Sequence, residues 1–169
     1  MTFASGSIAG TALLTAVLSF GCAASALAEE APHLRVDGAV THSLNLSAED
    51  LAALPQNDVQ ITYLTGHGSE TATYSGVAIW TILQKAGLDT IDKEKTSLRA
   101  HVLMLSAADG YQVAIALGEI DPFLEGKPAL IALKRDGQAI PAKDMFRVAL
   151  PGDKHGARNV HALTHIEVQ

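Results

Sequence analysis

The residues best suited to hold a ligand lie in one short stretch, from Phe146 to Val160. It contains an apolar run and then mixes charged side chains with glycine: Arg147, Asp153, Lys154, Gly156 and Arg158. Arginine and lysine donate hydrogen bonds to an anionic or heteroaromatic ligand, and glycine lets backbone N–H groups approach it closely. We interpret this stretch as a strand that ends in one wall of a binding site. Its composition fits a solvated hairpin loop equally well.

Catalysis by a protein nucleophile or a protein-bound metal has little support in the sequence. Cys22 is the only cysteine, and no serine lies in a Gly-x-Ser-x-Gly elbow. His161 and His165 have a spacing that brings two ligands together on a helix, but the alternation around them favours a strand. No further ligand stands at a supporting distance in the sequence. We therefore expect neither a catalytic residue nor a structural metal.

Short strands and few helices must position these residues. Alternating or continuous apolar residues predict strands over 34–46 (a pair turning at Asp37 and Gly38), 59–64, 98–105, 113–117, 129–133 and 160–168. Ser47 is predicted to cap a short helix that Pro55 ends, and Ser75 to cap a longer helix that ends at Gly87. This pattern predicts an α+β or mostly β domain.

Three polar loops follow the predicted strands, and a pocket forms if they share one edge of a sheet. The loops are Thr65–Ser69, Ser106–Tyr111 and Arg147–Asn159. Besides the cations they supply two hydroxyls, a carboxylate and an aromatic ring, from Thr65, Ser106, Asp109 and Tyr111. Such a pocket suits a flat, polar ring, because a carboxylate accepts from ring N–H groups while a guanidinium stacks or binds a phosphate.

The first 28 residues have the composition of a secretory signal. They contain no Lys, Arg, Asp or Glu, are largely small or apolar from Ile8 to Phe20, and end in small residues up to Ala28. We expect cleavage after Ala28, export to the periplasm, and a single mature domain of residues 29–169 that lacks Cys22. The formal net charge of −6 then belongs to this domain and argues against a nucleic-acid partner.

Several stretches together resemble the molybdopterin-binding domain of sulfite-oxidase-like oxidoreductases. The matching pieces are Tyr74–Val77 with Trp80 and Leu83, Ala108–Tyr111, Leu117–Pro122, Ala129–Gly137, Arg147–Pro151 and Gly156–Arg158. They cover nearly all of the expected mature chain in the order of the family. The resemblance implies an α+β, largely β fold around a curved sheet, in one domain, with a pterin or molybdopterin bound at the polar loops.

The resemblance also implies roles for single residues. Arg147 matches an arginine near the cofactor, Gly156–Arg158 match the segment that contacts its phosphate end, and Ser106 matches a hydroxyl residue of the pocket. With the loop residues, the expected pterin-binding set is Thr65, Ser106, Asp109, Tyr111, Arg147, Asp153, Lys154, Gly156 and Arg158.

The chain departs from the family at the metal ligand. In the enzymes a cysteine in the loop that matches Tyr63–Glu70 binds molybdenum, whereas this chain has Thr65 or a neighbour there. A hydroxyl does not replace a soft thiolate, so we do not expect a protein thiolate to hold molybdenum. Short secreted members without the cysteine resemble periplasmic pterin-binding proteins that report to membrane sensors controlling cyclic-di-GMP enzymes.

Three functions therefore remain open. The first is a non-catalytic pterin binder with a membrane partner of this kind. The second is a molybdenum-cofactor oxidoreductase that manages without the thiolate. The third is an interaction domain that binds no ligand.

Overall fold

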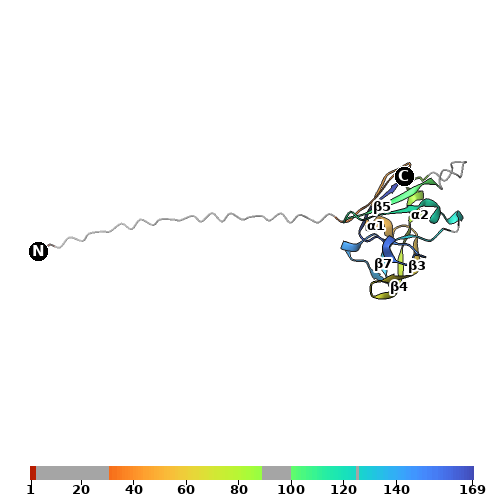
Figure 1. Ribbon diagram of the computed structural model, residues 1–169. Helices are drawn as coiled ribbons and strands as arrows, with labels where there is room; N and C mark the ends of the chain where they lie inside the picture. Colours follow the sequence, from red (N-terminus) through yellow and green to blue (C-terminus); the bar gives the residue numbers. More distant parts are fainter. Residues whose placement is uncertain (3–30, 89–99, 125) are drawn as a thin grey trace.

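The computed structural model describes residues 1–2, 31–88, 100–124 and 126–169, and two β-sheets form the framework of this part of the chain (Figure 1). The predicted signal peptide and the charged segment around residues 89–99 lie outside the described residues. None of the helices in the described part has the length and apolar character that crossing a membrane requires. The α+β, largely β architecture expected from the sequence is confirmed.

The first sheet has the strand order β2-β1-β10-β5-β6 and brings both ends of the domain together. Its strands are β1 Leu34–Gly38, β2 Leu44–Leu46, β5 Val102–Ala107, β6 Gln112–Ala116 and β10 Leu163–Val168. β1 runs parallel to β10, and the other neighbours are antiparallel. The closing strand predicted from alternation at the C-terminus thus pairs with the first strand of the domain.

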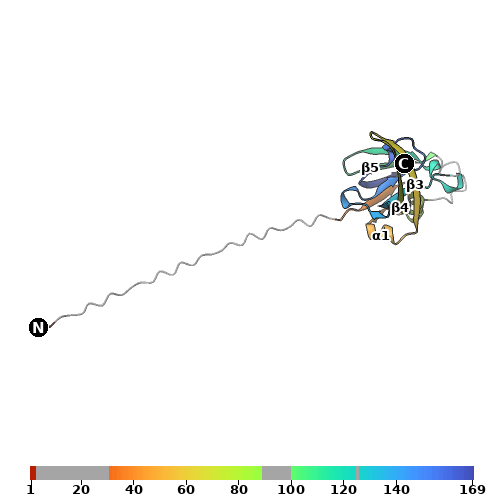
Figure 2. The same cartoon turned by 90° about the horizontal axis from the view of Figure 1, so that it is seen from below.

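The second sheet has the order β3-β4-β7-β8, and β9 also pairs with β7. Its strands are β3 Gln56–Thr65, β4 Gly68–Ala78, β7 Leu130–Arg135, β8 Gln138–Ala139 and β9 Arg147–Ala149. The helices of the described residues are α1 Ala48–Ala52 and α2 Ile79–Lys85, with 3₁₀ turns η2 Leu117–Glu119, η3 Pro122–Leu124, η4 Ala142–Asp144 and η5 Gly156–Arg158. Figure 2 shows α1 at the margin of the domain, next to β4, which it contacts.

Two apolar clusters hold these elements together. The larger one joins the inward residues of the first sheet, such as Leu103 and Leu105, to the buried side of α2. The smaller one surrounds Tyr74 and lines the second sheet with the inward side chains of β3, Val59, Ile61 and Tyr63. The alternation read from residues 59–64 therefore gave the correct face of the strand.

The turn predicted at Asp37 and Gly38 is wrong, because both residues belong to β1 and pair with β10. The cap predicted at Ser47 is confirmed. The Ser47 hydroxyl accepts from the backbone N–H of Asp50 at 3.1 Å, and the Asp50 carboxylate accepts from the Ser47 N–H, so α1 begins with a capping box. Asp136 and Gly137 connect β7 to β8 with positive φ angles, as is usual for an Asp-Gly pair in a two-residue hairpin turn.

The predicted helix start at Ser75 is wrong. Ser75 and Gly76 lie inside β4, and the helix begins only at Ile79, with Ala78 at the N-cap and no side-chain cap. Gly76 is needed for a different reason: a Cβ atom at this position would overlap the carbonyl oxygen of Ile131 in β7. The glycine that looked like a helix start is a point of close backbone approach between two strands.

The polar loop predicted at Thr65–Ser69 is also wrong. Thr65 is the last residue of β3 and pairs with Gly68, the first of β4, so the connection is a tight two-residue turn at Gly66 and His67. The Thr65 hydroxyl stays within this turn, donating to the Gly68 carbonyl at 3.0 Å and accepting from the His67 N–H at 3.1 Å.

The close approach at Gly76 gives a first test. Gly76→Ala should destabilise the fold by about 2 kcal/mol or more, because the added methyl group separates β4 from β7. Gly66→Ala is the matched control, since a Cβ there meets no atom within 4 Å. Urea unfolding of both variants measures the difference, and equal stabilities would contradict the strand contact.

Candidate functional site

A pocket of about 360 Å³ lies between the β5–β6 turn and η5. We call it the η5 pocket, and its lining residues are Ala107, Asp109, Tyr111, Gly156, Ala157, Asn159, Val160 and His161. Two of the three stretches that the sequence singled out thus meet in space. The third, at Thr65–Ser69, contributes no lining residue.

Hydrogen bonds fix the β5–β6 turn against η5. Gly110 has a φ of +86°, and the Asp109 carboxylate accepts from the Tyr111 N–H at 2.9 Å, which makes a tight turn within the predicted polar loop. The Tyr111 hydroxyl then donates to the Ala157 carbonyl at 2.9 Å. Tyr111 is 48% exposed and stands at the mouth of the pocket.

Asn159 has an amide group with no protein partner. The residue is only 4% exposed, the sole buried polar residue in the described part of the chain, and its Oδ1 accepts from the Leu150 N–H at 2.9 Å. Its Nδ2 is buried and has no hydrogen-bond partner. Leaving a buried donor unpaired costs about 1–3 kcal/mol, so Asn159 is a candidate donor to a ligand in the pocket that it lines.

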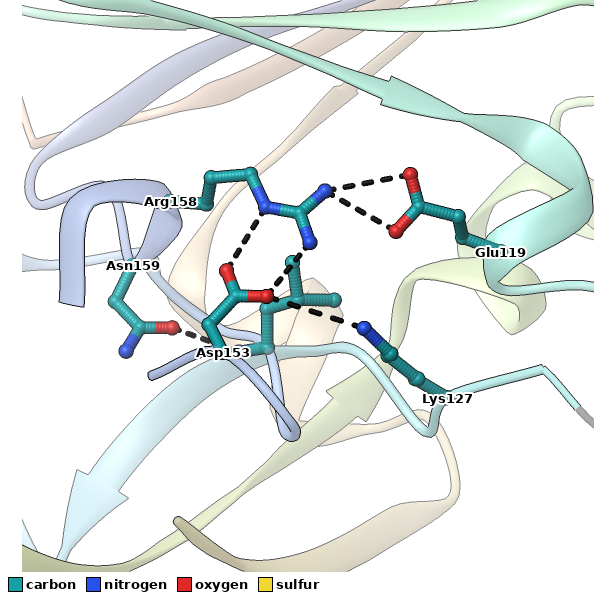
Figure 3. A network of polar contacts seen from close by, with 6 residues as sticks. Glu119, Lys127, Asp153, Arg158 and Asn159 are labelled. Atoms are coloured by element: carbon teal, nitrogen blue, oxygen red, sulfur yellow. Dashed lines mark hydrogen bonds and ion pairs between the residues drawn. The ribbon is translucent and has the colours of Figure 1, made fainter. Parts of the chain in front are cut away.

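Behind η5, Arg158 lies between two carboxylates (Figure 3). Its Nε and Nη2 donate to the two oxygens of Asp153 at 2.8 and 2.6 Å, and its Nη1 donates to Glu119 at 3.1 and 3.3 Å. The Lys127 Nζ stands 3.9 Å from Asp153. The hydrogen bonds from Arg158 hold the pKa of Asp153 below its usual range, and Asp153 in turn raises the pKa of Arg158. Asp153 and Arg158 are therefore both ionised at neutral pH.

Arg147 lines a second pocket of about 250 Å³, which we call the β8 pocket. Its other lining residues are Arg135, Gln138, Ala139, Ile140, Pro141 and Asp144. The Arg147 guanidinium lies over the Tyr74 ring at 5.2 Å, and its Nη2 donates to the Tyr63 hydroxyl at 3.4 Å. Its Nε is buried without a partner.

His161 and Tyr63 connect the two pockets. His161 lines the η5 pocket, and its Nδ1 is 3.9 Å from Asp144 of the β8 pocket. Burial, and then the charge of Arg147, lower the pKa of His161 from the ordinary 6.5, so the ring is neutral at pH 7. Tyr63 bonds to Arg147, while its ring is so close to Gly156 that a Cβ there would lie at 3.1 Å.

The predicted site residues fall into three groups. Asp109, Tyr111 and Gly156 line the η5 pocket, and Arg147 lines the β8 pocket. Asp153 and Arg158 lie in the ion network behind η5. Thr65, Ser106 and Lys154 line neither pocket.

Backbone geometry explains the third group. Ser106 alternates with Ala107 on β5, so when Ala107 faces the pocket Ser106 points to the other side, where its hydroxyl accepts from Gln112 at 3.1 Å. Lys154 is exposed, and it is its carbonyl that has a partner, the Leu64 N–H at 2.8 Å. That bond attaches the loop after β9 to the end of β3.

The expected set missed several polar residues in or beside the two pockets and the ion network, among them Tyr63, Glu119, Lys127, Asn159 and His161. Tyr63 was correctly assigned to the inner face of β3, but its position beside Arg147 depends on a contact across 84 residues. Glu119 bonds across 39 residues. Asn159 stood inside the stretch that was singled out, and no local signal marked its side chain as buried.

The sequence of residues 23–169 matches the family described as "Oxidoreductase molybdopterin binding domain", and the chain belongs to this family. Among solved structures it is similar to the sulfane dehydrogenase SoxCD from Paracoccus pantotrophus, with a TM-score of 0.65 and 16% identity. The similarity covers 81% of this chain but only 38% of that chain, and it shows a shared sulfite-oxidase-like fold. None of the curated proteins matches. The expected resemblance and fold class are thus confirmed, and the family implies a molybdopterin cofactor.

The η5 pocket fits the pterin ring of that cofactor better than its metal and phosphate. A carboxylate acceptor at Asp109 and an unpaired amide donor at Asn159 suit a heterocycle with both donors and acceptors. The described residues contain no group of three His, Cys, Asp or Glu that could hold a metal, and no thiolate. No lysine or arginine lines the η5 pocket to receive a phosphate.

The ion network makes stability depend on pH. Because the pKa of Asp153 is lowered in the folded protein, its carboxylate stabilises the fold above the ordinary aspartate pKa of about 3.9, and this contribution disappears as the pH falls through the lowered value. Asp153→Asn should cost about 1–2 kcal/mol at pH 7 and much less at pH 3. Urea unfolding at several pH values tests this against Asp58→Asn, which removes an exposed carboxylate. A pH-independent difference would contradict the assignment.

Proposed function

We propose that the chain is a binding protein for a pterin, which occupies the η5 pocket without a metal bond from a protein thiolate. The observation that carries the proposal is the unpaired, buried amide of Asn159 in the same pocket as the Asp109 carboxylate. The pocket volume of about 360 Å³ is in the range of small-molecule sites.

The chemistry of a pterin matches these groups. Its pyrimidine edge presents an amino group, a ring N–H and a carbonyl, so Asp109 accepts from the first two while Asn159 donates to the third. The half-exposed Tyr111 covers one face of the ring at the pocket mouth, where an aromatic contact adds affinity. In this arrangement the protein binds and orients the ring and supplies no catalytic group.

Export and a membrane partner are part of the same proposal. The uncharged, largely apolar first 28 residues support export to the periplasm with cleavage after Ala28. Several residues of the pocket wall, Tyr111 and Ala157 among them, are exposed, so a ligand that orders this wall also changes the surface that a partner would contact. The partner we propose is the periplasmic domain of a membrane sensor or cyclic-di-GMP enzyme.

Protein purified from the periplasmic fraction of its native cells tests the proposal directly. We expect a mature N-terminus at Glu29 and a fluorescent pterin released on denaturation, identified by mass spectrometry, with no stoichiometric molybdenum by elemental analysis. Stoichiometric molybdenum would instead favour an oxidoreductase that holds the metal through the cofactor's dithiolene and water. A protein that carries no pterin and binds none would leave a ligand-free interaction domain.

Two isosteric substitutions test the contacts. Asp109→Asn keeps the oxygen that accepts from Tyr111 but removes the charge, and Asn159→Asp keeps the acceptor for Leu150 but removes the donor. Each should weaken pterin binding by about 1–3 kcal/mol in calorimetric titrations. Ser106→Ala, at a hydroxyl outside the pocket, is the control and should bind as the wild type does. Unchanged affinity in both pocket variants would place the ligand elsewhere.

A further inference from the structure

The guanidinium that the family resemblance assigned to the phosphate end of the ligand is already paired with two carboxylates of the protein. Three of its nitrogen atoms donate to Asp153 and Glu119, and none of these three residues lines the η5 pocket. Lys127 adds a second cation near Asp153, so the network contains two positive and two negative charges and is balanced. A phosphate would have to displace a bidentate carboxylate to reach Arg158.

The same contacts hold the pocket wall in place. Asp153 precedes η5 in the loop after β9, and Glu119 belongs to η2 after β6, so Arg158 connects two segments from different sheets. The residues on either side of Arg158, Ala157 and Asn159, both line the pocket. Figure 3 shows Arg158 directed toward Glu119 and Asp153, with Asn159 next to it in the chain.

The lining of the η5 pocket also lacks a positive charge. Asp109 is its charged residue, and His161 is neutral at pH 7 because burial and Arg147 lower its pKa. Arg147 itself lines the β8 pocket and not the η5 pocket. A phosphate in the η5 pocket would therefore lose water without gaining a cation and would face a carboxylate.

We propose that Arg158 is a positioning residue that holds η5, and that the η5 pocket selects a pterin whose side chain carries no phosphate. This inference rests on the pterin-binding function proposed above. It differs from the role implied by the family resemblance, in which the segment Gly156–Arg158 contacts the phosphate of the cofactor.

Calorimetric titration with neopterin and with its monophosphate tests the selectivity. The wild-type protein should bind neopterin at least about tenfold more tightly, because an unpaired phosphate costs more than 1.4 kcal/mol to desolvate. Tighter binding of the monophosphate overturns the inference and leaves pterin binding intact. If neither compound binds, the proposed function itself fails.

Two variants separate positioning from phosphate contact, measured below their unfolding transitions so that lost stability alone does not change affinity. Arg158→Lys keeps the charge but cannot hydrogen-bond Asp153 and Glu119 in the same geometry. Because η5 is then held less firmly, neopterin binding should weaken about fivefold or more. A substitution at a residue that contacts only the phosphate would leave neopterin binding unchanged.

Glu119→Gln leaves the network with a net positive charge and should raise the monophosphate-to-neopterin affinity ratio about fivefold. Asp121→Asn makes the same charge change outside the network and should leave the ratio unchanged; a change as large as that of Glu119→Gln would contradict the inference.

Discussion

The pairing of Arg158 with Asp153 and Glu119 is the interaction on which the candidate site depends. Glu119 follows the first sheet at the end of β6, and Asp153 follows the second sheet after β9, so the guanidinium spans the place where the two sheets meet. A planar group with five donors is suited to two carboxylates at once, whereas an ammonium group would satisfy them only as a point charge. The Tyr111 bond to the Ala157 carbonyl fixes the same turn from the pocket side.

Much of the fold could be read from local patterns. Alternation placed Val59, Ile61 and Tyr63 on the inner face of β3, and the capping residues of α1 and the Asp136–Gly137 turn are features of a few adjacent residues. The wrong helix start at Ser75 arose because a local pattern was misleading there. Val77 is buried in β4 and Leu83 is buried in α2, so a strand that runs directly into a helix imitates the spacing of one longer helix. Only the partner strand β7 reveals why glycine stands at position 76.

The sequence identified the site residues that lie in recognisable turns and missed those that only long-range contacts bring to the site. Asp109, Tyr111 and Gly156 belong to turns that can be recognised from their residue types, and all three line one pocket in the structure. Arg147 and Arg158 both lie in the stretch from Phe146 to Val160, yet one has an unpaired Nε beside a pocket and the other donates to two carboxylates. The contacts of the two guanidinium groups differ because of Tyr63, Tyr74 and Glu119. These residues are distant in the chain, so no pattern within the loop reveals the contacts.

Charge and hydrogen bonding together limit what this site can hold. The cations behind η5 are balanced by carboxylates, so they add little to the affinity for an anionic ligand. The specificity of the pocket then depends on its neutral hydrogen-bond donors and acceptors. The buried Asn159 amide lowers the stability of the free protein by about 1–3 kcal/mol, and a ligand carbonyl recovers that cost on binding. The Asn159 side chain also accepts from the Leu150 N–H, and the Asn159 backbone N–H donates to the Gly156 carbonyl, so this residue is attached directly to η5. In the function proposed here, this residue couples ligand binding to the order of an exposed surface, which a protein that reports its ligand to a partner requires.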